Sequence, residues 1–258
     1  QNGEKLLIAG HGSLRGAARI AQRSARIAAF ERPRPGSRFL NMNRDFWHGK
    51  RVFLTGHTGF KGSWLALWLE SLGAEVTGYS LAPPTDPRLF EAASVGRGVR
   101  SIESDVRDAG AVVRGLADAK PDVVLHLAAQ SLVRYGYAEP LETYETNVVG
   151  TANVLQAVRE VDSVHAVIVC TSDKCYENRE WDRGYREDDR LGGKDPYSNS
   201  KACAELVTDA FRRSYFSDGN VAAAPARSRN VFGGSVWASG HLLPPLGRGL
   251  LAGEVGAL

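Results

Sequence analysis

Two short segments of the chain carry side chains suited to proton transfer. Tyr197 and Lys201 are four residues apart, about one helical turn, so both side chains share one face of a helix. A lysine ammonium beside a phenol favours the phenolate, which predicts that Tyr197 acts as a base near neutral pH. Upstream, Ser172, Asp173 and Lys174 end an apolar run and add a hydroxyl, a carboxylate and a second amine. These groups exceed what a simple alcohol oxidation requires.

A glycine-rich turn follows the first predicted strand. Gly56, Gly59 and Gly62 have the spacing G-x-x-G-x-x-G and lie between a strand pattern and a helix pattern. Glycines let the backbone turn sharply and approach a pyrophosphate, and the helix N-terminus supplies free N–H groups and a positive dipole end. This context favours a dinucleotide site over a plain tight turn. The spacing is typical of the short-chain dehydrogenase/reductase group.

From residue 50 onward the chain alternates between strand and helix patterns. Continuous Val/Ile/Leu strands that alternate with helices indicate a parallel sheet covered on both faces. The predicted fold class is therefore α/β, a doubly wound parallel sheet of the Rossmann type, in which ligands bind beyond the carboxyl ends of the strands. Strands are predicted at 51–55, 74–79, 99–103, 122–127, 166–171 and 221–226, and helices at 64–72, 109–119, 140–161 and 195–216.

The two ends of the chain differ from its middle. Residues 1–41 hold seven Arg and one Lys against two Glu, show no convincing core pattern, and precede the first Met, Met42. We interpret 1–41 as a non-native or disordered N-terminal extension, with an organelle transit peptide as the less favoured alternative. Residues 42–228 are predicted to form the dinucleotide-binding domain. Residues 229–258 are Gly/Pro-rich, with a short helical pattern at 246–251, and are interpreted as the start of an incomplete, truncated C-terminal substrate domain.

Composition and charge argue against several classes of protein. The 258 residues are 43% hydrophobic and 24% charged, as in ordinary globular proteins. Residues 1–41 carry a net charge of +6, and the whole chain carries +3, so the remaining residues carry −3. Because this part of the chain is slightly acidic, no nucleic-acid partner is expected. Apolar runs are short, so no membrane span is expected. Cys170, Cys175 and Cys203 form no CxxC pair, for which a reducing cytoplasm is the simplest interpretation. No metal site is predicted.

Several longer segments share the pattern of a known family. They are TGHTGFKGSW (55–64), SLAPPTDPRLF (80–90), HLAAQSLV (126–133), YAEPLETYETNVVGT (137–151), TSDKCYEN (171–178), GYREDDRLGG (184–193) and DPYSNSKACAE (195–205). Through them the chain resembles the extended short-chain dehydrogenases/reductases, and within these the nucleotide-sugar 4,6-dehydratases, above all the branch that acts on CDP-glucose. The resemblance runs from about Arg44 to Leu251 and is most specific in its middle.

The resemblance implies a reaction and a role for each catalytic candidate. It implies tightly held, recycled NAD, and the conversion of CDP-glucose to CDP-4-keto-6-deoxyglucose, a step of deoxysugar and O-antigen biosynthesis. Tyr197, assisted by Lys201 and Ser172, would remove the C4 hydroxyl proton. Asp173 would protonate the departing C6 hydroxyl. Lys174 stands where dTDP-sugar dehydratases have the Glu that serves as C5 base; it is either that base, with a lowered pKa, or the partner of a phosphate or a carboxylate.

The resemblance also implies a set of binding residues. Asp105 is either an adenine contact or the cap of the next helix, and His57 either touches the pyrophosphate or is a solvated loop residue. In this fold an acidic residue at the end of the second strand binds the adenosine ribose of NAD. No acidic residue stands there in this chain, so the sequence does not choose between NAD and NADP. Glu187–Asp189 are interpreted as a solvated loop. The cofactor candidates are Gly56, His57, Gly59, Phe60, Gly62, Asp105, Val106, Leu127, Ala128, Ala129, Asn147, Tyr197 and Lys201, and the substrate candidates are Gln130, Arg134, Ser172 and Asn230.

Two other functions remain open at this point. One is a 4-epimerase or reductase of the same fold, against which Asp173 argues because an epimerase needs no acid beyond the Tyr–Lys pair. The other is a non-catalytic dinucleotide-binding fragment. The chain departs from the family at Arg229, where the family has Gly, and at 234–237 and 240–242, which removes much of the nucleotide end of the substrate site. The family implies a cytoplasmic homodimer or homotetramer, joined through the helices at 140–161 and 195–216.

Overall fold

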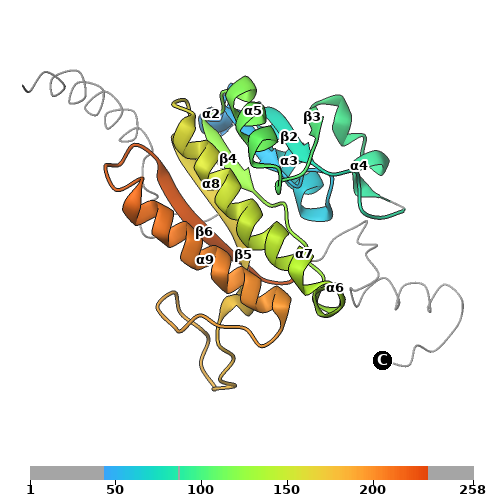
Figure 1. Ribbon diagram of the computed structural model, residues 1–258. Helices are drawn as coiled ribbons and strands as arrows, with labels where there is room; N and C mark the ends of the chain where they lie inside the picture. The colour runs from blue at the N-terminus through green and yellow to red at the C-terminus, as the bar shows by residue number, and fades with distance from the viewer. Residues whose placement is uncertain (1–43, 87, 232–258) are drawn as a thin grey trace, which may run out of the picture.

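Six parallel strands form the centre of the protein, in the order β3-β2-β1-β4-β5-β6. The computed structural model describes residues 44–86 and 88–231 (Figure 1). All six predicted strands are present, and the predicted α/β doubly wound sheet is confirmed. The order reverses between β1 and β4, which is the switch point where such folds bind ligands. The strands are β1 (Arg51–Thr55), β2 (Glu75–Ser80), β3 (Arg100–Glu103), β4 (Val123–His126), β5 (Ala166–Ser172) and β6 (Ala222–Ser228).

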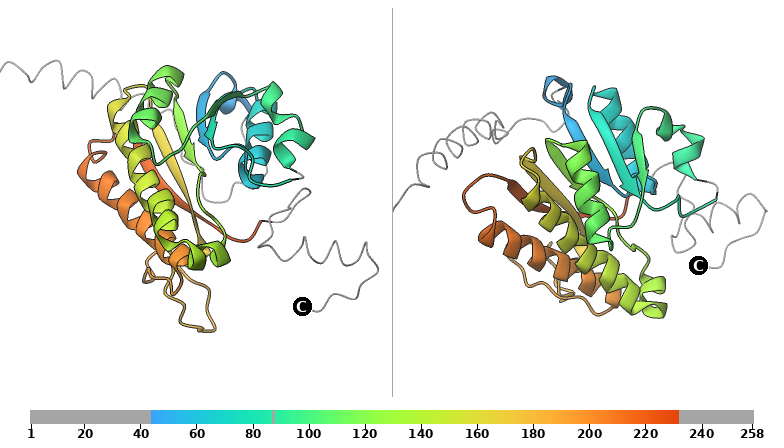
Figure 2. Two further views of the ribbon diagram at one scale, coloured as in Figure 1. Left: turned by 45° about the vertical axis from the view of Figure 1, so that its right-hand side comes forward. Right: turned by 45° about the horizontal axis from the view of Figure 1, so that its top comes forward.

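Helices cover both faces of this sheet. Figures 1 and 2 show α5, α8 and α9 on one face and α3 and α4 on the other. The helices are α2 (Arg44–Trp47), α3 (Phe60–Ser71), α4 (Leu89–Ala92), α5 (Ala109–Ala119), α6 (Val133–Ala138), α7 (Pro140–Tyr144), α8 (Gly150–Glu160) and α9 (Pro196–Ser214), with the shorter turns η1 (Val95–Arg97), η2 (Glu145–Val149) and η3 (Asp173–Cys175).

Alternate residues of each strand supply two separate hydrophobic cores. Phe53 joins the cluster beneath α5 and α8, whereas its neighbours Val52 and Leu54 join the cluster beneath α3. All three are at most 1% exposed. Successive strand side chains point to opposite faces, so a strand buried on both sides requires an unbroken apolar run. Each fully buried large apolar side chain contributes roughly 1.5–3 kcal/mol, so the two cores together hold the strand ends in fixed positions.

Two predicted helices differ from the observed ones in an informative way. The helix predicted from Trp64 begins at Phe60, because the end of the glycine turn forms its first turn. The single helix predicted at 140–161 consists of α7, the π-helical turn η2 and α8 in succession. A π-helical turn inserts an extra residue and is frequent at functional sites. The short helices α4 and α6 were not predicted.

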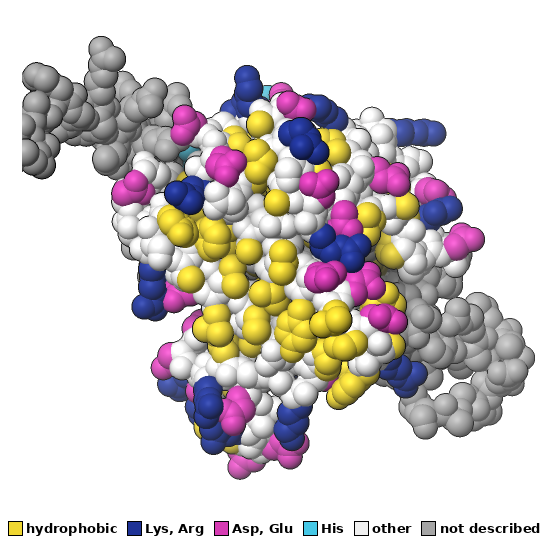
Figure 3. All heavy atoms as spheres, in the orientation of Figure 1, with side chains coloured by type: hydrophobic (Ala, Val, Ile, Leu, Met, Phe, Trp, Pro, Cys, Tyr) yellow, Lys and Arg dark blue, Asp and Glu magenta, His cyan; other side chains and the backbone are white. Residues whose placement is uncertain are grey.

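The predicted domain boundaries fall largely outside the part of the chain that the structure describes. Residues 1–41 and the helical pattern at 246–251 lie there, so both interpretations stay predictions. Within the described residues, no helix is both long enough and apolar enough to cross a membrane. Exposed apolar side chains gather over the face formed by α6 to α9 (Figure 3) and include Tyr137 on α6, Leu141 on α7, Val149 in η2, Leu206 on α9 and Tyr215 directly after α9.

Candidate active site

The ends of β1 and β4 approach each other without intervening side chains. Gly56 has φ +76°, and a Cβ there would lie 2.7 Å from the backbone nitrogen of Ala128. The Thr55 hydroxyl oxygen accepts hydrogen bonds from the N–H groups of Leu127 (3.1 Å) and Ala128 (3.0 Å). A left-handed φ and this close contact both require glycine at position 56. The loop after β4 is thereby fixed against the glycine turn.

The N-terminus of α3 is open to an anion. Gly59 is its N-cap, and no side chain accepts from the first turn. A Cβ at Gly62 would lie 2.0 Å from the carbonyl oxygen of Gly56, so the turn and the helix are in backbone contact. Free N–H groups and the positive end of the helix dipole fit a pyrophosphate. Gly56, Gly59, Phe60 and Gly62 therefore lie where the sequence prediction requires them.

The His57 side chain is neither solvated nor able to reach the pyrophosphate, so a cofactor contact of His57 through its backbone stays a prediction. The ring has no exposed surface, and its Nε2 lies 2.7 Å from the hydroxyl of Ser101. Burial lowers the pKa of His57 to about 4, so the ring is neutral at pH 7. A Cβ at Gly78 would lie 2.3 Å from the ring, so that glycine makes room for it. His57 therefore anchors the glycine turn to β2 and β3.

The residues after β3 have roles that the sequence did not predict. Asp105 is not a helix cap, because the carboxylate that accepts from α5 belongs to Asp108. Asp105 instead pairs with Arg107 at 2.6 Å, which lowers the pKa of that carboxyl despite its partial burial. The Val106 side chain is buried in the core, so only its backbone is available to a ligand. An adenine contact at this edge stays a prediction.

Asn147 joins the loop after β4 to α9. It is 1% exposed, and its Oδ1 accepts from the Gln130 N–H at 2.9 Å. Its Nδ2 donates to the Gln130 carbonyl at 2.9 Å and to the Ser200 hydroxyl at 2.8 Å. Asn147 lies in the π-helical turn η2, between α7 and α8. It therefore sets the distance between Ala129–Gln130 and the helix that carries Tyr197.

The Gln130 side chain is engaged within its own loop. Its Nε2 donates to the Thr143 hydroxyl at 2.9 Å, and its Oε1 accepts from the Leu132 N–H at 2.5 Å. The prediction that this amide reaches a substrate is therefore not supported by its orientation. Arg134 on α6 and Asn230 after β6 are both exposed, and their predicted substrate contacts stay predictions.

Tyr197, Ser172 and Lys201 meet at the end of β5. Asp195 caps α9 by accepting from the Ser198 N–H at 3.0 Å, which fixes the first turn that holds Tyr197. The Tyr197 phenol lies near Ser172, the last residue of β5, closely enough for that side chain to influence its pKa. Lys201 is 6% exposed, and its Nζ donates to the Cys170 carbonyl at 3.2 Å. The predicted Ser–Tyr–Lys arrangement is therefore formed.

The pKa values of this pair differ from the simple expectation. Burial raises the pKa of the Tyr197 phenol, and the nearby Ser172 side chain offsets this rise in part. The predicted lowering of the Tyr197 pKa by Lys201 is therefore wrong for the protein without ligand. Burial, with a smaller contribution from the nearby Lys61 ammonium, instead lowers the pKa of Lys201 to about 8. At pH 7 Lys201 stays mainly protonated but lies within reach of deprotonation.

Asp173 and Lys174 lie in η3, directly after Ser172. The Ser172 hydroxyl donates to the Asp173 carboxylate at 3.2 Å, and the Lys174 side chain is exposed. The Asp173 carboxylate lies 3.5 Å from the guanidinium of Arg229, which stands where the family has glycine. A cavity of about 480 Å³ adjoins Asp173 and is lined also by Tyr176, Glu187, Pro225 and Arg227. The turn after β5 thus presents a carboxylate next to Ser172 and an exposed amine one residue further along.

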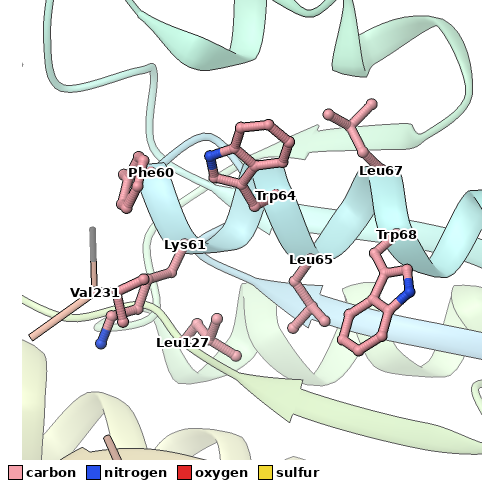
Figure 4. Close-up of a pocket in the computed structure, with 8 residues that line it drawn as sticks. All are labelled: Phe60, Lys61, Trp64, Leu65, Leu67, Trp68, Leu127 and Val231. Atoms are coloured by element: carbon pink, nitrogen blue, oxygen red, sulfur yellow. The ribbon is translucent and has the colours of Figure 1, made fainter. Parts of the chain in front are cut away.

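Lys61 is a site residue that the sequence reasoning missed. Its Nζ donates to the Ser228 hydroxyl at 2.7 Å, which connects the start of α3 to the end of β6. Figure 4 shows its amine beside Leu127 and Val231, at the edge of a largely apolar cavity of about 760 Å³. Trp64 and Trp68 line the same cavity and are 47% and 49% exposed. The sequence could have indicated this role, because Lys61 lies within the glycine turn, between Gly59 and Gly62.

The fold and the site define a class of protein. A doubly wound parallel sheet, a glycine turn at the switch point and a Ser–Tyr–Lys set at the next strand end together define a dinucleotide-binding protein of the extended short-chain dehydrogenase/reductase type. Residues 53–222 match the model of the family described as GDP-mannose 4,6 dehydratase. The chain belongs to this family.

Curated relatives include other nucleotide-sugar enzymes. A CDP-glucose 4,6-dehydratase of Salmonella typhimurium is 51% identical over 210 residues, which cover 80% of this chain and 58% of that protein. A dTDP-glucose 4,6-dehydratase of Mycolicibacterium smegmatis is 33% identical over 64% of this chain and 50% of that protein. The chain therefore spans little more than half the length of these relatives.

Solved structures agree on the fold. A dTDP-glucose 4,6-dehydratase of Streptomyces venezuelae with NAD bound has a TM-score of 0.66 and 27% identity, covering 79% of this chain and 62% of that one. A UDP-N-acetylglucosamine 4-epimerase of Methanobrevibacter ruminantium has a TM-score of 0.68 and 26% identity, covering 80% and 64%. Dehydratases and epimerases thus share this architecture, and the choice between them depends on the site.

Proposed function

We propose that the protein is a nucleotide-sugar 4,6-dehydratase that converts CDP-glucose to CDP-4-keto-6-deoxyglucose and water. The observation that carries the proposal is the position of Asp173, whose carboxylate accepts from the Ser172 hydroxyl and acts on the pKa of the nearby Tyr197 phenol. A dehydratase needs this extra acid, and a 4-epimerase does not. The 51% identity to a CDP-glucose 4,6-dehydratase supports the same choice and the nucleotide.

NAD is the proposed cofactor. The open N-terminus of α3 and the close approach of Gly56 to Ala128 fit its pyrophosphate. The dehydratase from Streptomyces venezuelae, which has this fold, holds NAD. When bound, nicotinamide would accept a hydride from C4 of the sugar and return one at C6. The contacts proposed for the cofactor come from Gly56, Gly59, Phe60, Gly62, Asp105, Leu127, Ala128, Ala129, Tyr197 and Lys201, with Asn147 as their support.

The chain's own residues divide the proton transfers between them. Tyr197 acts as the phenolate, which the Lys201 ammonium stabilises, and it takes the proton of the C4 hydroxyl to become the neutral phenol. Asp173 then protonates the C6 hydroxyl as it leaves as water. Lys174 is proposed as the base that removes the C5 proton, which the new C4 ketone makes acidic. Lys174 as a partner of a substrate phosphate is the alternative.

The role of Lys174 is tested by proton exchange at C5. Lys174→Ala is expected to slow the exchange of C5 hydrogen with solvent by about a hundredfold, because general-base catalysis contributes about that much or more. The exchange is followed by mass spectrometry of product formed in deuterated water. Full exchange in Lys174→Ala would show that the amine only binds the substrate.

A homodimer is the proposed assembly. The exposed apolar residues over α6 to α9 form one face, on which Leu141 is 78% and Leu206 59% exposed (Figure 3). Apolar patches of this kind mark protein–protein contacts. Leu206→Glu is expected to convert the dimer to a monomer in analytical ultracentrifugation. A wild-type monomer, or an unchanged dimer in the variant, would contradict the proposal.

One assay separates the candidate functions. The protein is incubated with CDP-glucose and NAD, and the alkaline absorbance of the 4-keto product is followed. Tyr197→Phe should reduce the rate by about a hundredfold or more. Formation of a C4 epimer without a ketone product would favour the epimerase. Binding of NAD without turnover of any CDP-, dTDP-, GDP- or UDP-sugar would favour the non-catalytic fragment.

A further inference from the structure

A buried ion pair lies one helical turn beyond Lys201. Glu205 on α9 is 4% exposed, and Arg227 on β6 meets it with two parallel bonds of 3.0 Å. The Thr171 hydroxyl donates to the same carboxylate. Hydrogen bonding with Glu205 raises the pKa of Arg227, so the guanidinium is permanently charged. The pair therefore joins α9, β5 and β6 at the residue that precedes Ser172.

The remaining donor of Arg227 points toward the catalytic turn. Its Nη1 donates to the Tyr176 hydroxyl at 2.6 Å and to the Glu187 carbonyl at 3.1 Å. The guanidinium also lies 4.7 Å from the centre of the Tyr176 ring. Tyr176 follows η3 directly, so the turn with Asp173 and Lys174 is held from both sides. Thr171 holds its start through Glu205, and Tyr176 holds its end through Arg227.

The loop between η3 and α9 closes onto the same anchor. Tyr176 stacks on Tyr185, with ring centres 4.8 Å apart. The Gly192 N–H donates to the Cys175 carbonyl at 2.8 Å, and the Glu177 N–H donates to the Arg190 carbonyl at 2.9 Å. These two hydrogen bonds join the two ends of the 176–191 loop. The loop forms a wall of the cavity next to Asp173.

We propose that Arg227, locked by Glu205, is a positioning residue that holds the Asp173–Lys174 turn in place for the elimination step. The kinetic part of this inference rests on the proposed function. Oxidation at C4 depends on Tyr197 and Lys201, whereas loss of water depends on Asp173 and Lys174. Misplacement by about 1 Å can slow a reaction a hundredfold. A disturbed anchor should therefore slow elimination far more than oxidation.

Two variants and one matched control test this. Tyr176→Phe removes the hydroxyl that accepts from Arg227 and keeps the ring stack, so it should still fold. Arg227→Lys keeps the charge but loses the two-pronged geometry, which lysine does not reproduce. Tyr185→Phe is the control, because among the residues that the structure describes that hydroxyl bonds Arg179 and Asn178, both within the loop. Each substitution is made singly, and the three variants are compared with the wild-type protein.

The first readout is kinetic and uses CDP-glucose with bound NAD. Elimination, followed by the 4-keto product, should fall about tenfold in Tyr176→Phe and about a hundredfold in Arg227→Lys. The initial reduction of NAD, followed by absorbance, should fall less than about twofold in both, so that reduced cofactor accumulates. Tyr185→Phe should show no accumulation. An equal loss of both steps, or no change in either, would overturn the proposal.

The second readout needs no turnover. Amide hydrogen exchange of residues 172–177 should be about tenfold faster in Arg227→Lys than in Tyr185→Phe, while exchange in β1 and β2 stays unchanged. Equal exchange in the two variants would overturn the proposal even in an inactive protein. A wild-type protein that makes no ketone would refute the proposed function alone, because the exchange result still decides whether Arg227 holds the turn.

Discussion

The glycine turn and the end of β5 lie at the same edge of the sheet but are held in place by different forces. Backbone contacts and hydroxyl groups fix the glycine turn, where Gly56 and Gly62 leave no room for a Cβ. Charged side chains fix the end of β5, where the buried Glu205 carboxylate is paired with the partly buried Arg227. The first region presents N–H groups to a ligand, and the second presents acids and amines to a reaction.

Because the two regions are held differently, they should tolerate different kinds of substitution. A backbone site tolerates changes of surface charge but no added atoms, because the adjoining peptide groups cannot move aside. A charge-anchored site tolerates small changes of shape but not the loss of one partner, since that leaves a buried charge uncompensated. Four predictions follow from the contrast, in order of the expected effect.

Removing one member of the buried pair should have the largest effect. Glu205→Ala is expected to lower the free energy of unfolding by about 4 kcal/mol, because the Arg227 guanidinium is left without its partner. Urea denaturation followed by circular dichroism measures this. Glu160→Ala, at an exposed site on α8, is the control and should change stability by less than about 0.5 kcal/mol. A loss below about 1 kcal/mol in Glu205→Ala would show that charge does not hold this region.

Adding one carbon to the glycine turn should come next. Gly62→Ala is expected to lower the free energy of unfolding by about 3 kcal/mol, the upper end for overpacking, and to abolish NAD binding. Calorimetry measures both effects. Gly184→Ala is the control, because a Cβ there meets nothing within 4 Å. Retained NAD binding in Gly62→Ala would mean that the turn can move away from α3.

The buried histidine should make the glycine turn sensitive to acid. The pKa of folded His57 is about 4, below its ordinary 6.5, so the unfolded chain takes up the proton first. The stability from this group is complete above pH 6.5 and is lost progressively as the pH falls toward 4. Between pH 7 and pH 5 the loss is about 2 kcal/mol.

The test compares the pH dependence of unfolding in two variants. His57→Gln should remove that part of the decrease between pH 7 and pH 5, whatever its stability at pH 7. His48→Gln, at an exposed position before β1, should keep the wild-type decrease. The same slope in His57→Gln as in wild type would show that the ring titrates normally in the folded protein.

The smallest expected effect concerns the corrected helix cap. Asp108→Ala should lower the free energy of unfolding by about 1 kcal/mol, because the Ala111 N–H loses its acceptor. Asp118→Ala, which is exposed near the other end of α5, should change stability by less than about 0.5 kcal/mol. Thermal unfolding measures both. Equal effects in the two variants would contradict the assignment of the cap to Asp108.

Much of the fold was predictable because its signals are local. Unbroken apolar runs gave all six strands, and the end of α5 at Ala119 followed from the proline at 121. The beginning of α3 was missed because Gly62 reads as a turn residue, although the helix needs a glycine there to contact Gly56. The π-helical turn was missed because no sequence periodicity marks one extra residue.

The candidate site was predictable to a different degree at each residue. The spacing of Tyr197 and Lys201 placed both on one helical face, and their meeting with Ser172 follows from parallel strand order. The side-chain directions of His57 and Gln130 could not be predicted, because they depend on distant neighbours: Gly78 opens a space for the first, and Thr143 binds the second. The charged anchor of Glu205 and Arg227 joins residues 22 positions apart, which no local pattern reveals.

The sequence by itself determined the sheet, the glycine turn and the residues able to perform acid–base chemistry, because each depends on periodicity or on spacing within one segment. Only the tertiary structure decided which of these groups are charged and where they point. Burial lowers the pKa of Lys201 to about 8 and raises that of Tyr197, and desolvation of this kind arises only when distant segments pack together. The hold of Arg227 on the Asp173–Lys174 turn has the same origin.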